Sequence, residues 1–396
     1  MPLPGFARGG DDIRSDAPMT ALVYDLQSGN RKALEDAYFN HEIDFFLNYR
    51  GVQNTVAREL YDLREAGKAV ESVNTLAASN FLRAVHSYPD DQLYIQGVID
   101  AADRHYEDAM KIFKDLIKRR REISPRLVSL SLMAAARVAH EVGDYSQAIF
   151  YYSRVHQFDR LFFESVFEKS WSFYQQGDMN GALGATLTFM TPYSENVFYP
   201  EAYIVRAAAF YQLCLFKRAN DTIEKMKKVF IPLQDQIKAL QKRQVESWLF
   251  DERILKSVDH RLLGYMIADR EFRSLERAQL SLQKEIKKLS GADLVKANEA
   301  FSFVRQRLAQ RAIQVLNKAE QELKKAMEEA DTIQIETLQL GVNVLTGAPV
   351  QMRDDLRTIQ LGDVDFDEQI QFWPFHGEFW ADELGSYYYG LKSQCH

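Results

Sequence analysis

The densest group of side chains with the potential for chemistry lies near the C-terminus. Imidazole, carboxylate and thiolate groups bind zinc or iron and act as acids and bases. The residues of this kind are His376, Glu378, Asp382, Glu383, Cys395 and His396. Their spacing fits none of the helical metal motifs, and Gly377 disfavours a regular helix there. A solvated or capping role is therefore the favoured interpretation, and a metal-dependent or ligand-sensing protein is the alternative.

Other catalytic motifs are absent from the sequence. It contains no Gly-rich phosphate loop, no Gly-x-Ser-x-Gly elbow and no His-Glu-x-x-His pair. Two cysteines, Cys214 and Cys395, are too few for a disulfide framework or a four-thiolate metal site, so we expect free thiols. We predict a protein that is not an enzyme and that has no cofactor.

Charge and hydropathy exclude further classes of function. The formal net charge of -7 leaves no global positive field for nucleic acid. No run approaches the roughly 20 apolar residues that a membrane helix requires, so we expect a soluble chain without a transmembrane segment. Residues 1–20, rich in Pro and Gly, are interpreted as a flexible leader.

The elements that position any site follow from a repeat of 34 residues. Gly143-Asp144-Tyr145 with Ala148 matches Gly177-Asp178-Met179 with Ala182. Looser copies begin at Arg104-His105-Tyr106 and at Cys214-Leu215-Phe216. Each copy has a small residue in its first helix and another early in its second helix, which lets the helix axes approach closely. The expected fold is all-α, a solenoid of four hairpins over residues 90–230, with divergent helical pairs over 21–89.

This pattern resembles the tetratricopeptide repeat family in its small residues, its Gly-Asp-Tyr turn and its Ala-aromatic spacing. The resemblance implies a groove lined by first-helix positions and suited to an extended peptide or a helix. The implied groove residues are Arg137, His140, Glu141, Phe167, Trp171, Tyr174, Gln175, Ile204, Tyr211 and Gln212. The family's paired Lys and Asn residues, which hold a C-terminal carboxylate, are missing.

Residues 231–346 change to long amphipathic stretches. Pro232 suits the first turn of a helix, and Leu275, Leu282 and Leu289 are seven residues apart, as in a coiled-coil seam. Ser290-Gly291 is the strong break. We therefore expect two long antiparallel helices, which offer a surface for self-association.

Residues 347–396 form an irregular tail that is rich in aromatic residues. So many rings do not remain in water, so the tail either caps the solenoid or docks on a partner. We expect the cap, with Trp373, Phe375 and Trp380 as its anchors. A third alternative is that the tail fills the groove until a partner displaces it.

The stretch Trp373-Pro-Phe-x-Gly-Glu-Phe-Trp380-x-Asp-Glu-Leu-Gly385 is similar to the ending of tetratricopeptide proteins of the bacterial envelope, of the kind found in gliding and predatory delta-class proteobacteria. The similarity implies a periplasmic or outer-membrane-associated assembly factor if the leader follows a removed export signal, and otherwise a cytoplasmic protein. The expected function is a scaffold that binds other proteins.

Overall fold

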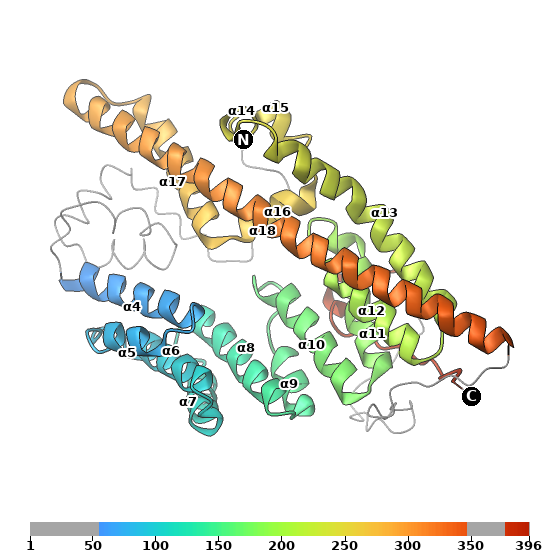
Figure 1. Ribbon diagram of the computed structural model, residues 1–396. Helices are drawn as coiled ribbons and strands as arrows, with labels where there is room; N and C mark the ends of the chain where they lie inside the picture. Colours follow the sequence, from blue (N-terminus) through green and yellow to red (C-terminus); the bar gives the residue numbers. More distant parts are fainter. Residues whose placement is uncertain (1–54, 347–376, 396) are drawn as a thin grey trace. The chain divides into compact units, whose positions relative to one another are not determined.

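Apolar and small residues at helical spacing determine the architecture. The computed structural model describes residues 55–346 and 377–395, and the regular secondary structure in these ranges is helical (Figure 1). The predicted all-α hairpin solenoid is confirmed. The hairpins are α4 (Thr55–Glu71) with α5 (Thr75–Leu82), α6 (Pro89–Ala102) with α7 (Tyr106–Lys118), α8 (Pro125–Glu141) with α9 (Tyr145–Tyr152), α10 (Phe162–Gln176) with α11 (Met179–Leu187), and α12 (Glu201–Gln212) with α13 (Phe216–Gln241).

The turn of every one of these hairpins has the same backbone conformation. In each turn a single residue, one or two positions past the end of the first helix, has a positive φ, between 55° and 87°. The N–H of the next residue then donates to a carbonyl five residues earlier, as Asp144 does to Ala139 and Asp178 to Phe173. This bond closes a Schellman turn, which favours Gly at the positive-φ position. The five positions are Val73, Arg104, Gly143, Gly177 and Cys214.

The small residues of the repeat lie where the helices cross. Ala136, Ser170 and Ala207 in the first helices are fully buried. The same is true of the second-helix alanines Ala109, Ala148, Ala182 and Ala219. At Gly97 an added Cβ would lie 2.8 Å from the ring of Phe113. A larger side chain at these positions would push the helices apart, which accounts for the periodicity in the sequence.

The prediction that a new helix starts at Pro232 is wrong, because α13 runs through this residue to Gln241. Proline removes a helical hydrogen bond and clashes with the preceding turn. Phe230, Leu233 and Ile237 are nevertheless buried on one face of the helix on both sides of the proline. Continuous burial of this apolar face offsets the local cost.

The predicted pair of long helices is confirmed. After α14 (Val245–Leu249), α15 (Glu252–Leu255) and α16 (His260–Ala268), the chain forms α17 (Arg270–Ile286) and the 56-residue α18 (Gly291–Thr346). Gly291 has a φ of +62° at the break. Leu275 and Leu282 are buried, as the seam predicts. Arg311 of α18 binds Asp269 through two hydrogen bonds of 2.8 and 2.7 Å.

The chain divides into two compact units, each of which combines several segments. Among the described residues, the first contains 55–131 with 243–257 and 265–317, and the second contains 132–242, 258–264, 318–346 and 377–395. The last three hairpin turns and the C-terminal segment all belong to the second unit. Among the described residues, no helix has the length and apolarity needed to cross a membrane.

Candidate functional site

The C-terminal segment 384–395 forms a site with α10, α11 and α12 in the second unit. After a short 3-10 turn at Ala381–Glu383 and a turn at 384–385, where Gly385 has a φ of +80°, the backbone has no regular secondary structure. The Gly385 N–H donates to Thr188 Oγ1 at 2.9 Å, and the Gln394 N–H donates to the Leu213 carbonyl at 2.9 Å. The expectation that the tail packs back across the solenoid is thus confirmed for residues 384–395. We call the surface that it covers the α11 face.

Asn180 of α11 pairs with the backbone of the tail. Its side-chain oxygen accepts the Leu391 N–H at 2.8 Å, and its side-chain nitrogen donates to the Leu391 carbonyl at 3.1 Å. Its own carbonyl accepts the Tyr389 N–H at 3.2 Å. Asn180 is only 1% exposed, so these bonds form away from water. One residue therefore satisfies three backbone groups of an extended peptide, without regard to the side chains of that peptide.

Two tyrosine side chains of the tail make contacts that other residue types could not make. The Tyr388 hydroxyl donates to Asp178 Oδ1 at 2.9 Å, and burial together with the neighbouring Asp178 raises the pKa of this tyrosine. Arg206 of α12 donates to the Tyr389 hydroxyl at 2.6 Å and lies 5.1 Å from the centre of the same ring. Tyr389 and Leu391 also pack against the apolar core formed by α10, α11 and α12. These contacts select aromatic and aliphatic side chains.

The tail approaches α11 most closely at Gly184. A Cβ added there would collide with the carbonyl group of Tyr387 and lie 2.8 Å from Tyr388 Cα. Glycine in the middle of a helix costs about 1 kcal/mol relative to alanine. Here its missing side chain makes room for the backbone of the bound segment.

A buried lysine faces the same segment. Lys169 of α10 donates to the Gly385 carbonyl at 2.7 Å and to Ser153 Oγ at 3.3 Å. Both acceptors are uncharged, and burial lowers the pKa of Lys169 to about 8. The amine therefore loses its proton under mildly alkaline conditions. The tail supplies one of its two hydrogen-bond acceptors.

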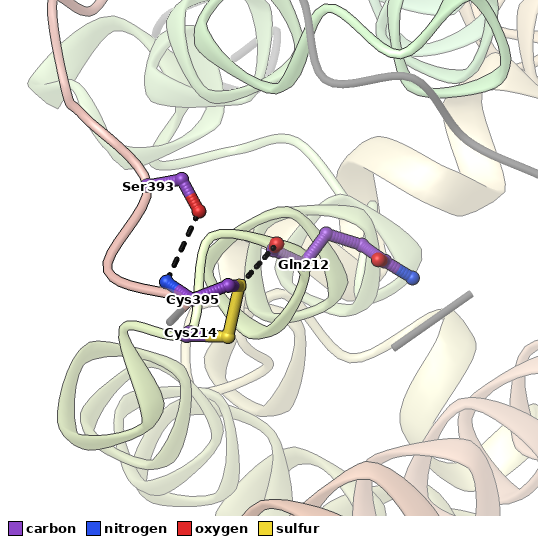
Figure 2. The surroundings of a disulfide bond; sticks show 4 residues. All are labelled: Gln212, Cys214, Ser393 and Cys395. Carbon is purple, nitrogen blue, oxygen red and sulfur yellow. Dashed lines mark hydrogen bonds between the residues drawn. A yellow bond between two sulfur atoms is a disulfide. The ribbon is translucent and has the colours of Figure 1, made fainter. Parts of the chain in front are cut away.

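The expectation of free thiols is wrong, because Cys214 and Cys395 form a disulfide with an S–S distance of 2.06 Å (Figure 2). Cys214 is the positive-φ residue of the α12–α13 turn and is buried, whereas Cys395 is exposed. The Cys395 sulfur lies 3.4 Å from the Gln212 carbonyl oxygen, and the Cys395 N–H donates to Ser393 Oγ at 3.2 Å. The two cysteines are 181 residues apart, so linear spacing gave no sign of the pairing.

The groove residues implied by the repeat family have mixed surroundings. Tyr174, Ile204 and Gln212 are buried, and Tyr174 belongs to the apolar core. Glu141 is exposed. The partly exposed members are His140, Phe167, Trp171, Gln175 and Tyr211. The side chains that share hydrogen bonds with the tail are those of Lys169, Asp178, Asn180, Thr188, Tyr193 and Arg206, none of which is in the groove set. Gln212 of that set meets the tail through its backbone carbonyl, beside the Cys395 sulfur.

Arg137 is the most strongly bonded groove residue. It donates to Glu168 through two nitrogens, at 2.9 and 2.6 Å, and to Glu164 at 2.7 Å. The Tyr152 hydroxyl donates to the same Glu168 at 2.8 Å. Nearby, the ring of His140 lies 2.8 Å from Ser172 Oγ, and burial lowers the pKa of His140. The network fixes α10 against α8 and α9. The Arg137 guanidinium, an implied contact for a partner, is bonded to Glu164 and Glu168 instead.

The other residues singled out near the C-terminus are dispersed. Trp373, Phe375, His376 and His396 lie outside the described residues. Trp380 is 57% exposed, and the buried contacts of the tail come from residues further along the chain. The preceding residue, Phe379, accepts a hydrogen bond of 3.4 Å from the Tyr193 hydroxyl through its carbonyl. Glu378 and Asp382 are exposed, and Cys395 is in the disulfide. Across 55–346 and 377–395, no three His, Cys, Asp or Glu side chains are grouped as metal ligands would be.

Asp144 and Asp178 occupy the same turn position in successive repeats, which allows a matched comparison. Each accepts the backbone N–H three residues later, but Asp178 is 4% exposed and also accepts the Tyr388 hydroxyl. We expect Asp144→Ala to lower the free energy of unfolding by about 1 kcal/mol, the usual value of a cap. Asp178→Ala should cost about 2 kcal/mol or more, because a buried hydroxyl also loses its acceptor. Urea titrations of both variants would show the difference, and equal costs would contradict a role of Asp178 in holding the tail.

Comparison with known proteins adds no family assignment. No protein-family model matches this sequence, and no curated protein matches it.

Proposed function

We propose that this protein is a non-enzymatic scaffold whose tetratricopeptide-type repeats bind other proteins. The supporting observation is that the second unit already holds a peptide segment without regular secondary structure, its own residues 386–395, through hydrogen bonds between Asn180 and the backbone of that segment. A surface that can satisfy the backbone of one extended segment has the properties that peptide recognition requires. The partner is a peptide or helix with apolar anchors, bound in the groove of α8, α10 and α12.

We further propose that the scaffold works in an oxidising compartment, as part of a bacterial envelope or motility assembly. The Cys214–Cys395 disulfide supports this, because such bonds persist in the periplasm and outside the cell and are rare in the cytosol. The similarity of the tail to envelope proteins points the same way.

The groove can be tested by affinity capture with the intact oxidised protein. Glu141 is exposed and Trp171 is partly exposed, so their replacement leaves most of the core in place. We expect the Glu141→Ala/Trp171→Ala variant to capture at least fivefold less partner from native cell extract than the unaltered protein. Mass spectrometry of the captured proteins would identify and quantify the partner.

Lys217→Ala provides the matched control for this capture. Lys217 is 88% exposed on α13 and pairs only with its helical neighbour Asp221. The control should capture as much partner as the unaltered protein. If the groove variant also retained full capture while its helical content was unchanged, the proposed groove would be ruled out as the main interface.

A further inference from the structure

We infer that the α11 face is a docking site for an extended segment of a partner protein, and that the chain's own C-terminus occupies this site as an exchangeable ligand. The inference deepens the proposed scaffold function and depends on it in part. It concerns a different surface from the groove of α8, α10 and α12. The chemistry of the required partner can be read from the segment that now occupies the site.

The partner segment resembles Tyr-Tyr-Gly-Leu in an extended conformation. Its backbone must present an N–H and a carbonyl to the side chain of Asn180, as Leu391 does. Two consecutive aromatic residues with hydroxyl groups satisfy Asp178 and Arg206. A small or flat stretch of backbone must pass over Gly184, where no side chain fits between the two chains.

The disulfide determines whether a partner can compete. While Cys395 is bonded to Cys214, the bound segment cannot diffuse away, so its effective concentration far exceeds that of a free peptide. When the bond is absent, the segment stays joined to the chain at its N-terminal end alone, and only hydrogen bonds and the packing of Tyr389 and Leu391 keep it on the α11 face. The site is therefore closed in the oxidised protein and open to exchange in the reduced protein, including newly made chains before oxidation.

The opening reaction needs a dithiol as reductant. Its thiolate attacks the sulfur of Cys395, the more exposed residue of the pair, the S–S bond breaks, and buried Cys214 leaves as a thiolate that takes up a proton. The second thiol of the reductant then attacks its own sulfur in the mixed disulfide and releases Cys395. The protein gains two thiols, and the dithiol is oxidised to a disulfide.

A labelled synthetic peptide of residues 384–394 tests the inference. Fluorescence anisotropy would be measured with the full chain, first oxidised and then reduced with dithiothreitol. We expect no saturable binding to the oxidised protein and measurable binding to the reduced one. The Cys395→Ser/Tyr389→Ala variant, whose own segment is weakened, should bind the peptide at least tenfold more tightly than the reduced unaltered protein does.

Methylated peptides provide the control without altering the protein. N-methylation at Leu391 removes the N–H that Asn180 accepts and should weaken binding at least tenfold. Lys392 is exposed and its N–H is not one of the groups that bond to Asn180. N-methylation at Lys392 should therefore change the dissociation constant of the peptide by no more than about twofold.

Three outcomes would each overturn the inference. The peptide could fail to bind the Cys395→Ser/Tyr389→Ala variant although the circular dichroism of that variant is unchanged. The two methylated peptides could bind equally well, or the unmethylated peptide could bind the oxidised and the reduced protein equally well. None of these outcomes affects the groove, which the capture experiment with Glu141→Ala/Trp171→Ala tests separately.

Discussion

Replacing Cys395 with serine is expected to lower the free energy of unfolding of the second unit by about 2 to 5 kcal/mol. The disulfide closes a loop of 181 residues, and the entropy that a cross-link removes from the unfolded chain grows with loop length. The tail contacts made by Tyr388, Tyr389 and Leu391 would weaken as well, because their segment would no longer be confined.

Urea titration followed by circular dichroism would measure this change. The unaltered protein in excess dithiothreitol should match Cys395→Ser in air, because both lack the bond. Ser393→Ala is the matched control, since it removes the hydroxyl beside Cys395 and keeps both sulfurs. If a thiol assay found two free thiols in the unfolded, air-oxidised protein, the bond and the expected difference would both be refuted.

The repeat architecture could be predicted from sequence because each hairpin requires particular residues locally. Gly143 and Gly177 are glycines at positions of positive φ, and Asp144 and Asp178 cap the helices that follow. The looser turns at Arg104 and Cys214 have the same backbone conformation without the glycine. Burial of neighbouring hairpins is enough to hold a residue with a Cβ in that conformation, at a cost of about 1 kcal/mol.

The α11 face could not be predicted in the same way, because its contacts join residues far apart in the chain. Asn180 binds Leu391 across 211 positions, and Lys169 binds Gly385 across 216. The one local signal is Gly184 within the short helix α11, where glycine is otherwise unfavourable. A glycine within such a helix therefore indicates the close approach of another backbone. Gly181 of the same helix instead makes room for the ring of Phe173.

The disulfide shows a similar limit of sequence reasoning. A count of two cysteines excludes a framework of several bonds, but it does not favour free thiols over one bond. A single long-range bond is compatible with the same count. The αL position of Cys214 places its side chain at the end of α12, where the returning tail reaches it. Only the three-dimensional path of the tail shows this proximity.

Lys169 should make the second unit more stable as the pH rises from about 8 toward 10. Burial lowers its pKa to about 8 from a usual value of 10.5, so the folded protein loses this proton before the unfolded chain does. Below pH 8 both states bind the proton, and the folded state bears the full cost of a buried charge. Between pH 8 and 10 the unfolded chain binds more protons, so the free energy of unfolding increases with pH.

The expected gain between pH 7 and pH 10 is about 2 to 3 kcal/mol, from the shift in pKa at 1.36 kcal/mol per unit. Above pH 10 the trend should reverse, because burial raises the pKa of Tyr152 and Tyr388, which keep their protons in the folded state only. Urea titrations at several pH values would show the maximum. Lys169→Met, similar in length and uncharged, should lose the rise between pH 8 and 10 and keep the decline above it.

The pKa of Lys169 also indicates whether the tail is bound to the α11 face. Its strongest acceptor is the Gly385 carbonyl, at 2.7 Å, and water would replace that acceptor if the segment left the α11 face. Hydration removes the cost of burial, so the pKa of Lys169 should return toward 10.5 in a released protein. Carbon-13 NMR of the lysine side chains should therefore show a titration near pH 8 in the oxidised protein and a higher midpoint in Cys395→Ser/Tyr389→Ala. An unchanged midpoint in that variant would mean that the solenoid alone buries Lys169, and that the tail does not cover it.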